Sequence, residues 1–213
     1  MEIMKYRIAK PIDCKCIVEL HHAIREKYSV GIFAQLGKPF LKQYYRIILN
    51  DRNSVIVCAE DDHGIMQGFC SSTLDMQAQL KHLKKHKFLL GISALSSLIS
   101  NPKLILQLFE RFKAIDSSSD NKIIITEGAR SEYWAWDTKN NDSISSVEMY
   151  VTNLKILKCL GVKTVSGEVD KVNRKVLAFQ KANGFKIIDE IKLSDGRERY
   201  ILSCDLTNWN PKI

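Results

Sequence analysis

The sequence has few of the residues that mark disulfide-bonded, metal-binding or low-complexity chains. Of its 213 residues, 10 are glycine and 4 are proline, an ordinary globular usage that excludes collagen-like and disordered classes. None of the 6 cysteines lies in a C-x-x-C pair, the spacing typical of zinc and redox sites. Cys14 and Cys16 are the closest pair, and we interpret them as reduced thiols on the first turn of a helix, in a cytoplasmic protein without a secretory signal.

Long apolar runs are also missing, because no stretch reaches the roughly 18–20 apolar residues that span a bilayer. The nearest candidate, residues 88–99, contains three serines and follows a run of lysines and histidines. Such a basic amphipathic segment could lie on a membrane surface. We expect instead that it docks on its own domain, since a helix of mixed faces packs within the molecule when a core is available.

Several catalytic fingerprints are absent. The sequence contains no G-x-S-x-G motif, no P-loop and no dinucleotide-binding glycine pattern. His82 and His86 have the i,i+4 spacing of a metal pair, but no third ligand is suggested, so we predict no metal site. The net charge of +8 favours polyanionic partners such as nucleic acid, anionic lipid or a phosphorylated cofactor. Because no basic stripe with interleaved aromatics is present, nucleic-acid binding is not expected.

The length and the hydrophobic pattern predict one mixed α/β domain over residues 1–213. Strands are expected at residues 3–9, 54–59, 66–72, 132–136, 163–169, 185–191 and 198–205. A further β-prone stretch at 122–126 forms either a separate strand or one bulged strand with 132–136. Helices are expected at 13–27, 39–48, 143–160 and 173–182, with a loop at 29–38. Asp13 is the expected N-cap of the first of these helices, and Asp142 or Ser143 is that of the third, which is expected to end at Gly161. Residues 75–115 are predicted to form two helices, broken at Asn101 and Pro102 and inserted between the third and fourth strands. Their expected buried positions are Leu80, Leu83, Phe88, Leu95, Leu98, Leu104, Leu108 and Phe112.

The closing segment carries the most specific motif. A strand is followed by Val169-Asp170-x-x-Asn173, a short helix, and then Asn183-Gly184-Phe185. In residue type and spacing this segment resembles the Gcn5-related N-acetyltransferase (GNAT) superfamily. The resemblance covers nearly the whole chain except residues 75–115, and it implies a mostly antiparallel central sheet flanked by helices.

The resemblance also implies a place for acetyl-coenzyme A. In the family this cosubstrate lies in a wedge between two splayed strands, with its pyrophosphate at a helix N-terminus, where unpaired amides bind phosphate. The implied cofactor-binding residues are Tyr133, Trp134, Ala135, Trp136, Asn140, Asn141, Asp142, Ser143, Ile144, Ser145, Ser146 and Asn173. Every glycine of the family's phosphate loop is replaced here, and Asp142 adds a carboxylate where phosphates would approach. Without the family, residues 140–146 are simply a helix-capping loop.

Two positions bear on catalysis. Glu132 stands where the family often has a base or water-holding group, although a solvent-facing strand charge is an alternative interpretation. Glu127 and Asp137 are weaker candidates for the same role. Gln180 replaces a tyrosine that the family uses to protonate the departing thiolate, and an amide cannot supply that proton. The proton must come from another acid or from solvent, or the chain is inactive.

The resemblance therefore predicts an acetyl-CoA-dependent N-acetyltransferase of a small-molecule or sugar-like amine, which attacks the thioester directly. The alternative is a catalytically inactive GNAT-fold binding or partner module. The acceptor is expected between the 29–38 loop, with Phe33 and Gln35, and the 193–199 turn. The sequence does not predict the oligomeric state.

Overall fold

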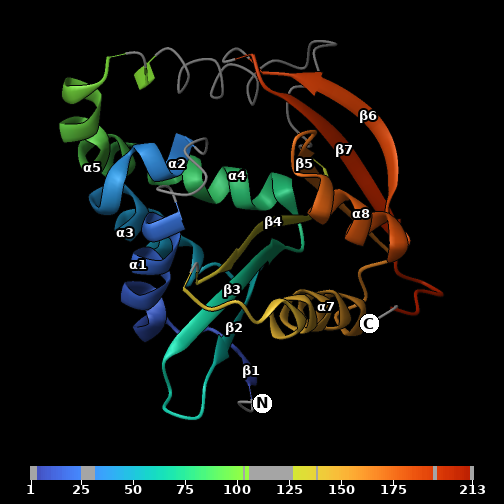
Figure 1. Ribbon diagram of the computed structural model, residues 1–213. Helices are drawn as coiled ribbons and strands as arrows, with labels where there is room; N and C mark the ends of the chain where they lie inside the picture. Colours follow the sequence, from blue (N-terminus) through green and yellow to red (C-terminus); the bar gives the residue numbers. More distant parts are fainter. Residues whose placement is uncertain are drawn as a thin grey trace.

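The structure is a computed structural model that describes residues 4–24, 32–102, 104–105, 127–137, 139–193 and 196–211. Its centre is a seven-stranded sheet in the order β1-β2-β3-β4-β5-β7-β6 (Figure 1). The strands are β1 (Lys5–Ile8), β2 (Ser54–Glu60), β3 (Met66–Thr73), β4 (Ala129–Trp136), β5 (Thr164–Asp170), β6 (Lys186–Lys192) and β7 (Glu198–Asp205). All neighbouring strands are antiparallel except β4 and β5, which run parallel. The predicted mixed, mostly antiparallel sheet is confirmed.

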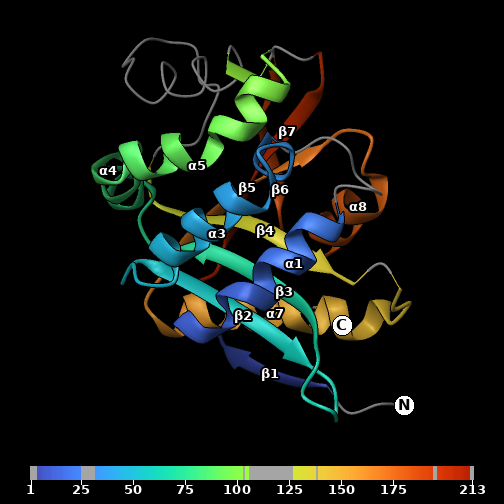
Figure 2. The ribbon, with the colours of Figure 1, turned by 90° about the vertical axis from the view of Figure 1, so that its left-hand side faces the viewer.

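Helices cover both faces of the sheet. They are α1 (Cys14–Ile24), preceded by a short 3-10 turn at Pro11–Asp13, then α2 (Ile32–Gln35), α3 (Gly37–Ile48), α4 (Met76–Lys85), α5 (Lys87–Ser100), α7 (Ser143–Cys159) and α8 (Arg174–Ala182). Figure 2 shows α1 and α3 in front of β2, β3 and β4, with α7 behind them. The sheet therefore separates two hydrophobic cores.

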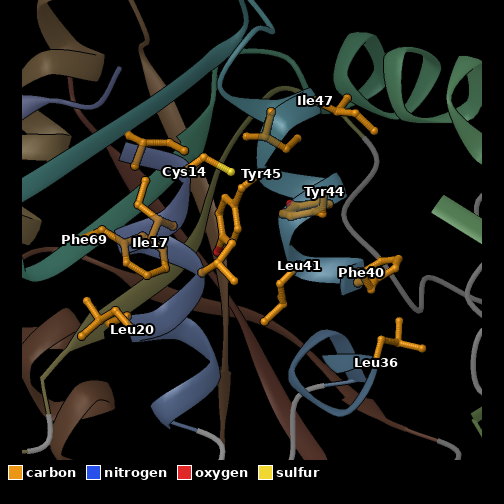
Figure 3. Close-up of a cluster of buried hydrophobic side chains, with 14 of the residues drawn as sticks. Cys14, Ile17, Leu20, Leu36, Phe40, Leu41, Tyr44, Tyr45, Ile47 and Phe69 are labelled. Atoms are coloured by element: carbon orange, nitrogen blue, oxygen red, sulfur yellow. The ribbon is translucent and has the colours of Figure 1, made fainter. Parts of the chain in front are cut away.

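The core between the sheet and α1 and α3 is rich in aromatic residues. Tyr45 of α3 is fully buried between α1 and α3 and meets Phe69 of β3 edge to face, with ring centroids 5.7 Å apart (Figure 3). Ile17 of α1 and Leu41 of α3 are also fully buried in this cluster. Aromatic and aliphatic burial of this kind is the main term that holds the two helices on the sheet.

The second core lies between the sheet and α7. Met149, Leu154 and Leu157 of α7 are completely buried there. Asn153 is the polar exception: its amide nitrogen lies 3.4 Å from the carbonyl oxygens of Val55 and of the β3 residue Cys70. The Ser72 hydroxyl donates a 2.5 Å hydrogen bond to the Asn153 amide oxygen. Because these bonds are buried, they fix the position of α7 along β2 and β3.

The predicted helix ends and turns are largely confirmed. Asp142 caps α7, and Gly161 ends it in the left-handed region at φ +87°, which favours glycine. Asn173 is the N-cap residue of α8, and Gly184 follows this helix at φ +91°. The closing hairpin of β6 and β7 is present, as is the hairpin of β2 and β3.

The predictions for the start of the chain need two corrections. Asp13 does not cap α1 directly; it closes the preceding 3-10 turn, and its carboxylate accepts bonds from the Lys10 amide and the Arg7 guanidinium. Part of the predicted 29–38 loop is helical, since α2 occupies four of its residues.

The prediction for residues 75–115 is partly wrong. Helix α5 ends at Ser100, as the break at Asn101 implied, but the chain also breaks earlier, at His86 between α4 and α5. The reason is that the two helices have different partners: the buried Gln79 of α4 reaches Ser54 of β2 and Glu132 of β4, whereas α5 lies against α3. Residues 106–126, which include the rest of the second predicted helix and the β-prone stretch at 122–126, fall outside the described residues.

Candidate active site

The sheet is split between its two parallel strands. In the described part of the chain, β4 and β5 pair at Ala129 with Val165 and at Arg130 with Ser166, and no pairing follows. β5 then continues along β7 to Asp170, while β4 continues along β3 to Trp136. The edge of β4 that faces the split therefore presents backbone amides and carbonyls to which an extended, amide-bearing molecule can bind.

A β-bulge in β4 lies beside this split. On β3, Ser71 pairs with Tyr133 and Ser72 pairs with Ser131, so Glu132 is the extra residue. The bulge breaks the alternation of side chains, and Glu132 and Tyr133 both lie on the α1 and α3 side of the sheet. The sequence pattern gave no sign of this, because a bulge depends on the pairing partner as well as on the strand itself.

Glu132 is partly buried in a polar environment. The Gln79 amide nitrogen lies 3.5 Å from its carboxylate, and the same nitrogen is 3.3 Å from the Ser54 hydroxyl. Burial raises the pKa of Glu132 above its ordinary value, and the positive charge of Arg130 opposes that rise. A carboxyl group with a raised pKa is suited to accept a proton near neutral pH. This environment argues against the alternative of a solvent-facing strand charge.

An aromatic cluster lies on the same side as Glu132. The ring of His21 is 4.7 Å from that of Tyr133, and His21 Nδ1 forms a 2.7 Å hydrogen bond with the Tyr45 hydroxyl. Burial lowers the pKa of His21 to about 4, so the imidazole is neutral at pH 7. The sequence did not single out His21 as part of a site; its position on a buried helix face was the only available signal.

The two predicted acceptor residues lie on α2, at the edge of this cluster. The Phe33 ring is 4.9 Å from Tyr44 and 6.0 Å from Tyr133. Gln35 is partly buried at the end of α2. The structure thus brings Phe33 and Glu132 to the same side of the sheet. In the 193–199 turn, residues 194 and 195 fall outside the described residues.

Asp142 occupies the start of α7. Its carboxylate accepts a 3.0 Å bond from the Ser145 amide and a 2.6 Å bond from the Ser145 hydroxyl. The Ile144 amide also bonds this carboxylate, and these bonds hold the pKa of Asp142 below its ordinary value. The Ser143 and Ser146 amides bond to the carbonyls of Asn141 and Asp142. The amides that would meet a pyrophosphate are therefore already paired within the loop.

The opposite side of the split is lined by aromatic rings. Trp134 of β4 stacks on Tyr150 of α7 with centroids 4.6 Å apart, and its indole nitrogen donates a 3.0 Å bond to the Ser146 hydroxyl. Phe179 of α8 completes the group at 5.4 Å from Trp134. This arrangement joins β4, α7 and α8 next to the place where β4 leaves β5.

Gln180 points into this group. Its side chain is 5% exposed, and its amide nitrogen donates a 3.2 Å bond to the Tyr150 hydroxyl. The Tyr150 hydroxyl is also hydrogen-bonded to Ser131, the first β4 residue beyond the paired region. Burial raises the pKa of Tyr150, so the hydroxyl keeps its proton. Tyr150 could not be recognised as a site residue from the sequence, because its spacing is that of one of several apolar positions of a core helix.

The remaining predicted residues lie apart from these groups. Ala135 and Trp136 belong to the two cores, and Trp136 packs against Gly68 of β3, where any side chain would collide with the indole ring. Asn173 is exposed at the start of α8. Asn140 bridges the Asp142 amide and the Gln67 side chain. Glu127 is exposed before β4, and Asp137 bonds the Lys139 amide after it.

The described residues contain neither a cluster of metal ligands nor a membrane-spanning helix. No group of three or more His, Cys, Asp or Glu side chains could hold a metal ion in this part of the chain. Nor does any helix among these residues have the length and apolar character to cross a membrane.

Comparisons with known proteins give likeness in structure alone. No family model matches the sequence. No curated protein matches it either. Among solved structures, a GCN5-related N-acetyltransferase from Kribbella flavida superposes with a TM-score of 0.60 at 10% identity, covering 95% of this chain and 98% of that one.

Two further structures show the same likeness. The PaiA N-acetyltransferase from Thermoplasma acidophilum, solved in complex with coenzyme A, has a TM-score of 0.56 at 11% identity and covers 95% of this chain and 99% of that chain. The ribosomal-protein-S18-alanine N-acetyltransferase from Escherichia coli has a TM-score of 0.55 at 10% identity and covers 99% of both. The chain therefore has the GNAT fold, as the closing motif implied.

Proposed function

We propose that this protein is an acetyl-CoA-dependent N-acetyltransferase whose acceptor is a small-molecule or sugar-like amine. The observation that carries the proposal is the split between β4 and β5 with the partly buried Glu132 at the bulge beside it. Strand β4 supplies both the place for the cosubstrate and the candidate base. Its edge at the split can hold an extended thioester arm, and its bulge turns the Glu132 carboxyl group toward the acceptor side. The fold alone would not carry this conclusion, because one fold can host many functions.

The split and the α7 terminus differ in how well they fit acetyl-CoA. Beyond Arg130, where its pairing with β5 stops in the described residues, the edge of β4 offers backbone groups to the amides of the pantetheine arm. At the start of α7, Asp142 takes the amides that would bind the pyrophosphate. We propose that the arm binds along β4 and that the phosphates bind weakly unless the Asp142 side chain turns away.

Glu132 is assigned the role of general base. An ammonium group cannot attack a thioester, so the acceptor must first lose a proton, and a carboxyl group with a raised pKa can receive it directly or through water. The partly buried Phe33 and Tyr133 rings lie on the same side and are proposed to shape the acceptor site. The buried His21 ring packs against Tyr133 and bonds the Tyr45 hydroxyl, so it supports this surface from the core. Aromatic rings beside the Glu132 carboxyl group suit a ring-bearing or sugar-like amine.

Tyr150 is the candidate for the missing acid. Its protonated hydroxyl lies between Ser131 and Gln180 beside the split, so it can donate a hydrogen bond to sulfur at that place. In this proposal Gln180 positions the Tyr150 hydroxyl and does not itself supply a proton.

The test of the proposed function is the pH dependence of turnover in wild type and Glu132→Gln, measured as release of free thiol with a panel of amines. The wild-type rate should rise with pH through the raised pKa of Glu132, because the base must be unprotonated. The variant should lose this limb and roughly 10²–10⁴-fold in kcat/KM. The control is Glu190→Gln, an exposed glutamate on β6 whose removal should leave the profile unchanged.

Two results would count against the proposal. If Glu132→Gln keeps the wild-type profile, another group is the base. If wild type binds coenzyme A but acetylates no amine, the chain is an inactive GNAT-fold module, an outcome with which the occupied α7 terminus would agree.

A further inference from the structure

The outward face of α5 is apolar and open to solvent. Four large side chains lie on it: Phe88, Ile92, Leu95 and Ile99, with exposed fractions of 76, 66, 51 and 78%. Their spacing of four, three and four residues places them on one narrow face of the helix, which we call the α5 stripe. The sequence analysis expected Phe88 and Leu95 to be buried on the domain, and that expectation is wrong.

The opposite face of α5 is already docked. Leu90 and Ala94 are buried in the core beside α3, and the Ser97 hydroxyl donates a 2.8 Å bond to the Leu36 carbonyl. Figure 1 shows α5 beside α2 and α3 at one end of the molecule. The helix therefore cannot rotate to bury the stripe without losing this contact. A helix that is apolar on both faces is normally covered on both.

The chain segment that carries the stripe has charges of one sign. Between Asp75 and Glu110 the sequence contains no acidic residue and five lysines. Lys81, Lys85 and Lys87 are exposed at the end of α4 and the start of α5. The Lys87 ammonium lies 5.4 Å from the centre of the Phe88 ring, so positive charge borders the first residue of the stripe directly.

We propose that α4 and α5 dock this protein on an anionic lipid surface. The α5 stripe would enter the boundary between headgroups and acyl chains, and the lysines would meet lipid phosphates, as in other interfacial basic helices. A second copy of the chain fits less well, because symmetric pairing through the stripe would bring the exposed lysines of α4 and α5 close to those of the other copy. This proposal does not depend on the acetyltransferase function.

The test is co-sedimentation of the full chain with phosphatidylcholine vesicles, with and without about one third phosphatidylserine. Wild type should bind the anionic vesicles, and added salt should weaken binding. Ile92→Ser with Ile99→Ser should reduce the partition coefficient about tenfold or more. The matched control is Ile65→Ser with Ile188→Ser, two isoleucines of similar exposure on the β2–β3 turn and β6, which should bind like wild type.

A second pair of variants tests the charge. Lys85→Gln with Lys87→Gln should weaken binding about fivefold for each lysine. The control, Lys186→Gln with Lys192→Gln, removes the same charge from the β6 edge, on the other side of the molecule in Figure 1, and should bind like wild type. All four variants change exposed positions, so unchanged melting temperatures will confirm folding.

Three outcomes would overturn the proposal. Equal binding to neutral vesicles would show that anionic lipid is not recognised. If wild type binds neither kind of vesicle, a lipid surface is not the partner of the α5 stripe. Self-association of wild type that is lost in Ile92→Ser with Ile99→Ser, without vesicle binding, would assign the stripe to a second copy of the chain, as sedimentation velocity would show.

Discussion

At the scale of single residues, two carboxyl groups of the candidate site, Glu132 and Asp142, have opposite surroundings. Glu132 is partly buried with few donors, and its pKa is raised; Asp142 accepts three hydrogen bonds at a helix N-terminus, and its pKa is lowered. The first is suited to exchange a proton, whereas the second stays charged and repels phosphate. An acidic side chain thus supports the proposed proton transfer at Glu132 and opposes binding of the cofactor's phosphates at Asp142.

Replacing Asp142 by asparagine should tighten coenzyme A binding. Asparagine still caps α7 through its amide oxygen, but it carries no charge toward the pyrophosphate. We expect a dissociation constant about tenfold lower, measured by calorimetry or by the ligand-induced rise in melting temperature. Pantetheine, which lacks the pyrophosphate, is the control and should bind wild type and variant equally. An unchanged affinity for coenzyme A would place its phosphates away from α7.

His21 should make the fold sensitive to acid. Its folded pKa of about 4 lies below the ordinary value near 6.5, so the unfolded chain binds the proton more readily. The contribution of the neutral His21 to the free energy of unfolding is fully present above pH 6.5 and is lost as the pH falls through 4. The full loss, reached well below pH 4, is about 3 kcal/mol. Urea unfolding of wild type and His21→Gln at pH 7 and 4.5 should show that the variant loses less stability on acidification.

The control for this experiment is His63→Gln, in an exposed turn. It should respond to pH like wild type. If His21→Gln also shows the wild-type acid response, burial of the imidazole is not the cause.

At the scale of secondary-structure elements, β4 does the most for the site. It pairs with β3 along its length, leaves β5 after two residues and carries the bulge that turns Glu132 toward α1 and α3. The position of α7 behind it decides whether Tyr150 reaches Ser131. Docking of α7 is therefore a condition for the proposed site.

Asn153 should be the residue that holds α7 in place. Replacing it by alanine removes the buried bonds to β2 and β3 and leaves the Ser72 hydroxyl without its acceptor. We expect a loss of about 2–3 kcal/mol in the free energy of unfolding, measured by urea denaturation. Lys155→Ala, on the exposed face of the same helix, is the control and should cost little. Equal losses in both would mean that packing alone positions α7.

At the scale of the whole molecule, the lysines that contribute to the net charge of +8 are proposed to have different roles in different places. The lysines of α4 and α5 belong to the proposed lipid-docking surface, next to the helices that frame the acceptor side. Those at the β6 edge lie far from it and serve as controls. If α5 lies on a bilayer, α2 and α3 lie close to that surface, and an amine carried there would meet the site from the membrane side.

The local pattern of the sequence determined most of the fold. Alternating apolar residues placed the hairpins, glycines at 161 and 184 placed the helix ends, and the closing Val169 to Phe185 motif predicted the GNAT arrangement. These features act between neighbours in the chain, so they can be read without the structure. The assignment of Glu132 and Gln180 to catalysis stays a prediction for the experiments above.

The tertiary structure decided what depends on pairing between distant segments. The bulge at Glu132 needs the register of β3, the bond of Gln180 to Tyr150 needs α7 and α8 side by side, and the amides at Asp142 are occupied by a cap geometry that the sequence left open. The exposure of Phe88 and Leu95 had the same cause. Helix α5 has apolar residues on two faces, and the sequence does not distinguish between them. Packing against α3 decides which face is buried and which is exposed to solvent.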